Sequence, residues 1–81
     1  MEGKDRERFN ALWRLLEEKT DHDLIRITEA AIDAAQTYDY LGFSEQADNE
    51  RRIAAVAHSI AFHTRDKEAA LEIVMAARES R

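Results

Sequence analysis

Residues 21–44 read DHDLIRITEAAIDAAQTYDYLGFS, a long stretch of patterned apolar residues that ends at Gly42. The apolar residues recur at alternating spacings of three and four, which is typical of a helix that packs along one seam. They are Leu24, Ile27, Ala31, Ala34, Tyr38 and Leu41. Because the chain has no proline and no other glycine after position 3, Gly42 marks its clearest interruption. The pattern predicts a helix over 21–41, which Gly42 ends in the left-handed conformation.

The apolar face of this helix is wider than one neighbour can cover. Ile25, Ile32 and Ala35 extend the seam sideways. At about 100° per residue the apolar arc spans roughly 220°, against a stripe of about 100° for a one-sided helix. We therefore expect coverage on two sides, by the chain itself and by a second copy or another partner.

A one-sided amphipathic helix is predicted over 4–18, ahead of this stretch. Phe9, Leu12, Trp13 and Leu16 fall on one face, and Leu15 widens it. Thr20 is the predicted N-cap of the following helix, because its hydroxyl can accept from an amide of the first turn. This arrangement predicts a short connection between the first two helices.

A third helix is predicted over 45–63, with Ser44 as its N-cap. Its core face consists of Ile53, Ala54, Val56, Ala57, Ile60 and Ala61. Beyond residue 63 the apolar face moves by roughly 150° at about 100° per residue. Two interpretations stay open. One is a single helix of more than 30 residues; the favoured one is a turn at 64–66, with Thr64 or Asp66 capping a fourth helix over 66–79.

Residues 53–76 also resemble one hairpin of the tetratricopeptide repeat family. The residues that match its large and small positions are Ile53, Val56, Ala57 and Ile60 in the first helix and Ala69, Ile73 and Ala76 in the second. The tryptophan or tyrosine, the turn glycine and the closing proline of the family are absent, and no copy stands about 34 residues upstream. The resemblance implies a helical hairpin here, without membership of the family.

Composition places the chain among small acidic domains. A single domain of 81 residues gains only about 3 to 5 kcal/mol from its core. The absence of cysteine excludes disulfides and thiolate zinc sites. With a net charge of −5 and no net positive half, the chain lacks the field that drives non-specific nucleic-acid binding. We expect an all-α antiparallel bundle of three or four helices over 1–81, completed by homodimerisation.

The sequence predicts a cytoplasmic location. Spanning a bilayer takes about 20 consecutive apolar residues, and no run approaches that length. The first eight residues, MEGKDRER, are charged where a signal peptide would be apolar.

No catalytic, cofactor or metal site is predicted. On a helix His58 and His63 would lie about 140° apart and could not chelate one ion as a pair four residues apart does. The serines have no glycine-rich elbow beside them, and no phosphate-binding loop occurs. His63 lies at the edge of the third helix's seam, where a histidine could make association depend on pH. The alternative is a half-exposed residue at a helix end.

Several aromatic residues fall outside the expected core. Phe62 lies opposite the core face of its helix, Tyr40 lies on a polar side, and Phe43 follows Gly42. The candidate interface residues are Ile25, Ile32, Tyr38, Tyr40, Phe43, Phe62 and His63. The alternatives are that Phe43 makes the contact usual after a glycine cap and that Phe62 packs on the fourth helix.

These features predict a small non-enzymatic adaptor or regulatory protein that binds other proteins as a homodimer. The alternative is a dimeric DNA-binding regulator that uses Arg51, Arg52, Arg65 and Lys67. Acidic neighbours beside each of these cations favour solvated ion pairs instead. A third interpretation is a structural subunit of a larger assembly.

Overall fold

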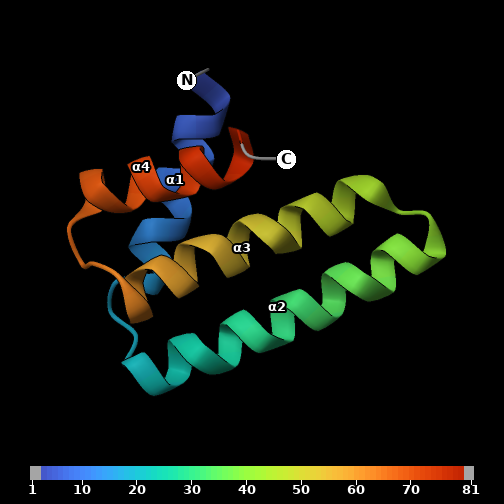
Figure 1. Cartoon of the computed structure of the whole chain (residues 1–81), viewed down its shortest axis with the longest axis horizontal. Coiled ribbons are helices and arrows are strands. Elements are labelled where there is room, and N and C mark those ends of the chain that lie inside the picture. The colour runs from blue at the N-terminus through green and yellow to red at the C-terminus, as the bar shows by residue number, and fades with distance from the viewer. Residues whose placement is uncertain (1–2, 80–81) are drawn as a thin grey trace.

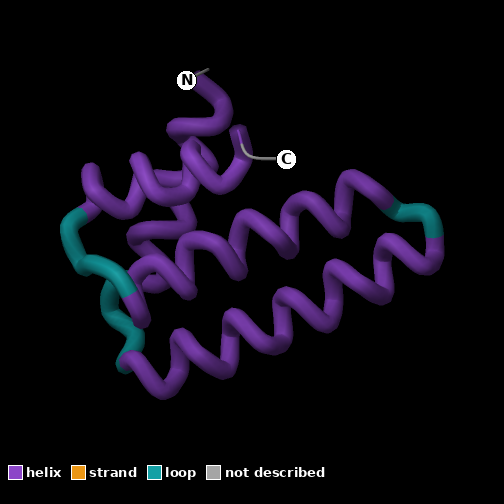
Figure 2. The backbone as a smooth tube through the Cα atoms, viewed as in Figure 1, coloured by secondary structure: helices purple, strands orange, loops and turns teal. Residues whose placement is uncertain are grey.

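Four α-helices make up residues 3–79, the part of the chain that this computed structural model describes (Figure 1). They are α1 (Gly3–Leu16), α2 (Asp21–Leu41), α3 (Ser44–Phe62) and α4 (Lys67–Glu79). No strand occurs in this range, and the connections are short loops (Figure 2). Because α3 and α4 are separate, the four-helix interpretation is confirmed. The helical hairpin implied by the tetratricopeptide resemblance is present.

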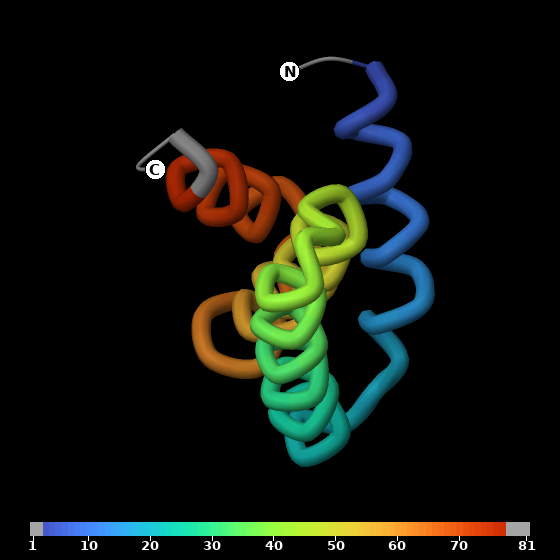
Figure 3. Tube along the Cα trace, turned by 90° about the vertical axis from the view of Figure 1, so that its right-hand side faces the viewer, coloured from blue at the N-terminus to red at the C-terminus, as the bar shows by residue number. Residues whose placement is uncertain are grey.

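α3 is the central helix of the fold. α2 lies antiparallel to it along its whole length (Figure 1), whereas α1 and α4 pack on α3 away from α2 (Figure 3). α1 runs steeply to the direction of α2 and α3 and passes behind α4 in Figure 1. An antiparallel arrangement was expected for the whole bundle, and α2 and α3 show it most clearly.

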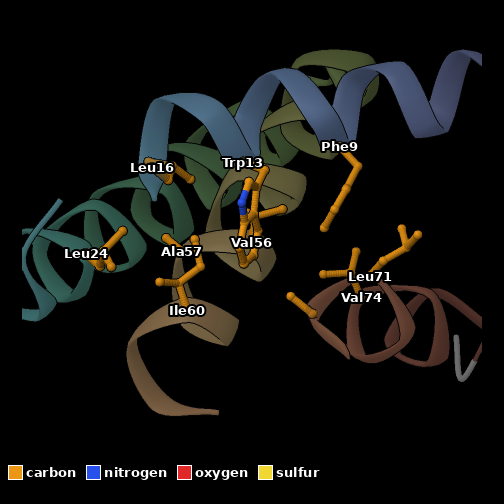
Figure 4. Packing of buried hydrophobic residues seen from close by; sticks show 10 residues of the cluster. Phe9, Trp13, Leu16, Leu24, Val56, Ala57, Ile60, Leu71 and Val74 are labelled. Carbon is orange, nitrogen blue, oxygen red and sulfur yellow. The ribbon is translucent and has the colours of Figure 1, made fainter. Parts of the chain in front are cut away.

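Large side chains from α1, α3 and α4, joined by Leu24 of α2, form the main buried cluster (Figure 4). The rings of Phe9 and Trp13 are stacked with centroids 5.9 Å apart. The other buried members of this cluster are Leu16, Leu24, Val56, Ala57, Ile60, Ala70, Leu71 and Val74. Leu15 was expected to widen the apolar face of α1, but it is 68% exposed. Leu15 therefore lies outside the buried Phe9–Trp13–Leu16 side of α1.

Small side chains dominate the contact between α2 and α3. Leu24, Thr28, Ala31 and Ala35 of α2 are buried, as are Ala47 and Ala54 of α3. The Thr28 hydroxyl donates to the Leu24 carbonyl oxygen at 2.8 Å, which satisfies its buried polar group.

The predicted α2 seam is confirmed in part, because Leu24 and Ala31 are buried and Ala35 is buried beside them. Thr28 takes a central place that was assigned to apolar residues, whereas Leu41 is exposed. Ile27 is half-buried and packs against the large-residue cluster. The buried residues of α2 follow the order Leu24, Thr28, Ala31 and Ala35, which has the spacing of one helical face.

Gly42 ends α2 in the left-handed conformation, with φ at 83°, as predicted. Its N–H donates to the Asp39 carbonyl at 3.1 Å, and the Phe43 N–H donates to the Tyr38 carbonyl at 2.8 Å. The Tyr38 and Phe43 rings meet at 6.4 Å, so Phe43 makes the contact usual after a glycine cap. Ser44 is the first residue of α3 rather than its N-cap, because Phe43 already holds the capping position.

The opposite end of the hairpin is held by side chains. The Thr20 hydroxyl accepts from the Asp23 N–H at 3.2 Å, which confirms the predicted N-cap. Both candidate residues act before α4: Thr64 accepts from the Asp66 N–H, and Asp66 accepts from the Glu68 N–H. Arg65 donates to the Asp21 carboxylate at 2.6 Å and to the carbonyls of residues 17 and 19, so it joins the two connections.

Candidate protein-binding surfaces

An ion pair between Asp39 and Arg51 defines one side of the α2–α3 seam. Seven residues make nearly two helical turns and return to the same side of a helix. On α2, Ile32 lies seven residues before Asp39, and Ile25 lies seven residues before Ile32, so both are on the same side of the helix as Asp39. Seven residues after Arg51, α3 carries His58. Because the helices are antiparallel, Ile32 lies level with His58 on this side.

By this count Ile25, Ile32 and His58 fall on this side of the hairpin, and Phe62 follows His58 by one helical turn. We call these four residues the hairpin face. Ile32 is 46% exposed and Phe62 is 57% exposed, whereas Ile25 is half-buried. The His58 ring contacts the Phe62 ring, with centroids 4.8 Å apart. Phe62 therefore lies on the surface beside His58, and the hairpin face gathers three of the predicted interface residues.

Three other predicted interface residues lie at the far end of the hairpin. The hairpin tip comprises Tyr38, Tyr40, Leu41 and Phe43, on either side of Gly42. Tyr40 is 90% exposed, whereas Tyr38 is half-buried beside Phe43. The predicted set thus divides into a face along the hairpin and a patch at its tip.

His63, the remaining predicted residue, lies just beyond α3. α3 ends at Phe62, and His63 has φ and ψ of −121° and −59°. Its ring lies 5.3 Å from the His58 ring, so the predicted wide separation of the two histidines is wrong. A helical wheel does not apply to a residue past the helix end. Within the described residues, no group of three or more histidine, aspartate or glutamate side chains is placed to hold a metal ion.

On the other side of the seam, α1 and α3 form an open groove of about 280 Å³. Its walls are Arg8, Ala11, Leu12, Asn49, Arg52 and Ile53, and we call it the Arg8–Arg52 groove. A smaller cavity of about 20 Å³ shares Arg8, Leu12 and Arg52 with it. That cavity reaches the core residues Phe9, Val56, Val74 and Met75 and also touches Asp5.

Arg8 was not among the residues predicted from the sequence to form a site. It lies in a charged N-terminal stretch, and only the packing of α1 on α3 brings it near Arg52. Arg8 and Leu12 are one helical turn apart, which places them on the same side of α1. The sequence does not indicate which residues of α3 lie opposite them.

The four candidate nucleic-acid contacts do not share one face. Arg51 pairs with Asp39 and Asp48 on the hairpin-face side, whereas Arg52 lines the groove and donates to the Asn49 side-chain oxygen at 2.9 Å. Arg65 is engaged at the connections, and Lys67 is half-buried at the start of α4. The ion pairs expected from the sequence are present for Arg51 and Arg65.

Comparison with known proteins gave no match to a family model, a curated protein or a solved structure. Across the described residues, no helix combines the length and apolar character needed to cross a membrane.

Proposed function

We propose that this chain is a small non-enzymatic adaptor or regulatory protein of the cytoplasm, which binds other proteins and forms a homodimer through the hairpin face. The observation that supports this proposal is the pair of large apolar side chains, Ile32 and Phe62, exposed on one side of the hairpin. An exposed apolar surface shared by two helices is typical of a protein-binding site.

Covering this face would contribute substantially to stability. Complete burial of a large apolar side chain is worth about 1.5–3 kcal/mol, and a half-exposed one gains part of that. A two-fold dimer uses the same patch on both subunits, so each apolar residue counts twice. For a domain whose core alone yields about 3 to 5 kcal/mol, such a gain is large.

The DNA-binding alternative has less support, because Arg51 and Arg65 are paired with carboxylates and the four cations are dispersed. It predicts retention on duplex DNA that weakens with salt and with the double substitution Arg51→Ala and Arg52→Ala. The third interpretation, a subunit of a larger assembly, predicts a stoichiometric complex with other chains.

Sedimentation equilibrium over a range of concentrations tests the proposal. We expect the native chain to dimerise at micromolar concentrations, and Ile32→Glu or Phe62→Ala to shift it toward monomer. Leu15→Glu is the matched control, because Leu15 is also an exposed apolar residue but lies on α1. A native chain that stays monomeric at these concentrations would contradict the homodimer, as would equal dissociation by Leu15→Glu.

A further inference from the structure

We propose that the Arg8–Arg52 groove binds an acidic peptide segment of the partner protein, in which a carboxylate stands beside a large apolar side chain. This inference rests on the proposed protein-binding function. It concerns a different surface from the hairpin face, because the groove lies between α1 and α3.

The groove is built from matching positions on two helices. α1 contributes residues 8, 11 and 12, and α3 contributes residues 49, 52 and 53. Each set has the spacing i, i+3 and i+4, which places its members on one helical face. Each set pairs an arginine with a branched apolar residue. On α3, Ile53 directly follows Arg52. On α1, Leu12 comes four residues, or about one turn, after Arg8. Each wall therefore offers a cation and an apolar surface together.

The charges of the groove select an anion. None of the six residues that line it is acidic, and a carboxylate, that of Asp5, lines the adjoining cavity together with Arg8 and Arg52. Asn49 accepts from one Nη of Arg52 at 2.9 Å, which fixes the guanidinium while its other N–H groups can still donate. Guanidinium groups bind carboxylates through paired hydrogen bonds, so the two arginines can hold a carboxylate at the groove.

The size and apolar floor of the groove favour a peptide. At about 280 Å³ it lies near the lower end of ligand pockets, which span roughly 300–1,000 Å³, so it suits one or two side chains. Leu12 and Ile53 are half-buried, and apolar core residues line the smaller cavity beside them. A free phosphate would leave this apolar surface uncovered. An apolar side chain next to a carboxylate would cover it.

The test uses a capped pentapeptide of alternating leucine and glutamate, titrated into the full chain while the methyl signals of Leu12 and Ile53 are followed by NMR. We expect saturable shifts of both signals. A matched peptide with glutamine in place of glutamate should bind at least about tenfold more weakly, because charge-assisted hydrogen bonds are lost. Arg8→Gln and Arg52→Gln should each weaken binding to a similar degree.

Controls separate this inference from the proposed dimer. Arg14→Gln removes a charge from an exposed position of α1 outside the groove and should leave peptide affinity unchanged. The Ile32→Glu variant should still bind the peptide even where it no longer dimerises. Circular dichroism checks that each variant keeps its helices, and Arg52→Lys, which keeps the charge, should retain more affinity than Arg52→Gln.

Three results would overturn the inference. One is the absence of saturable shifts at Leu12 and Ile53, and another is equal affinity for the glutamate and glutamine peptides. The third is inorganic phosphate producing the same shifts at equal or lower concentration, which would make the groove a site for small anions. Each of these can occur whether or not the chain dimerises, so failure of the groove and failure of the dimer are distinguishable.

Discussion

The two sides of α3 are packed in different ways. Toward α1 and α4, aromatic and branched side chains such as Phe9, Trp13 and Val56 interlock in one cluster. Toward α2, the contact is dominated by alanines, with Thr28 among them. The contacts of α3 with α1 and α4 are short and bury large side chains. The contact of α3 with α2 runs along the length of both helices and buries mainly small side chains.

This difference explains why large apolar residues remain on the surface of α2. When alanines occupy the centre of a seam, the helices approach closely and little room is left beside them for larger side chains. Ile25 and Ile32 lie next to the seam rather than in it, and Ile32 is exposed. The small residues in the α2–α3 seam and the apolar residues of the hairpin face therefore result from the same packing of α2 on α3.

Of the substitutions that test the difference between the two sides of α3, Trp13→Ala should have the largest effect. Deleting a buried indole from the large-residue cluster should cost about 3–5 kcal/mol in the free energy of unfolding, comparable to the stability expected for a domain of this size. Urea unfolding followed by circular dichroism measures the loss. Leu15→Ala, at an exposed position of the same helix, should change stability by less than about 0.5 kcal/mol. A loss below about 1 kcal/mol for Trp13→Ala would show that this cluster does not dominate stability.

Ala54→Leu tests the seam. The larger side chain should push α2 away from α3 and cost about 1–3 kcal/mol, as overpacking of a well-packed core does. The same urea experiment applies. Ala30→Leu makes the identical change at an exposed position of α2 and serves as the control. Equal stability of the two variants would mean that the helices are not closely packed at Ala54.

Gly42→Ala should destabilise the chain by about 1–2 kcal/mol, because an L-residue resists the left-handed conformation. A Cβ atom at this position would meet no atom within 4 Å, so the cost comes from the backbone alone. Gly3→Ala, where a Cβ also meets nothing and φ is not left-handed, is the matched control. Thermal unfolding that is unchanged by Gly42→Ala would contradict the importance of this turn.

The smallest effect is expected for Arg65→Gln at the other end of the hairpin. Its ion pair with Asp21 is solvent-exposed, and such pairs contribute about 0–1 kcal/mol. The difference from the native chain should narrow at high salt, because screening weakens the native pair. Arg26→Gln, an exposed arginine on α2, provides the baseline. If Arg65→Gln lowered the free energy of unfolding by well over about 1 kcal/mol, the contacts of Arg65 would matter more for stability than the turn at Gly42.

Features set by local chemistry were predictable from the sequence. The left-handed turn at Gly42 follows from one residue type, and the Thr20 cap follows from one hydroxyl near a helix start. The break before α4 was indicated by the change of apolar face, because no straight helix could present both faces to one core.

Features that depend on which helices meet were not predictable. Thr28 reads as polar, yet its hydroxyl is satisfied by its own helix, so it is buried in the seam. The two histidine rings meet because α3 ends one residue before His63. For the candidate sites, exposed apolar residues could be proposed from the width of the apolar arc. Arg8 could not be paired with Arg52 without the packing of α1 on α3.

The turn at Gly42 also has a consequence for the order of folding. It joins α2 and α3 through two residues, so their seam forms between segments that are neighbours in the chain. The contacts of α1 with α4 bridge much longer separations, as in the pair of Arg6 with Glu68, 62 residues apart. Local contacts require less loop closure and form sooner. We expect the hairpin to assemble first and to present α3 as the surface on which α1 and α4 then dock.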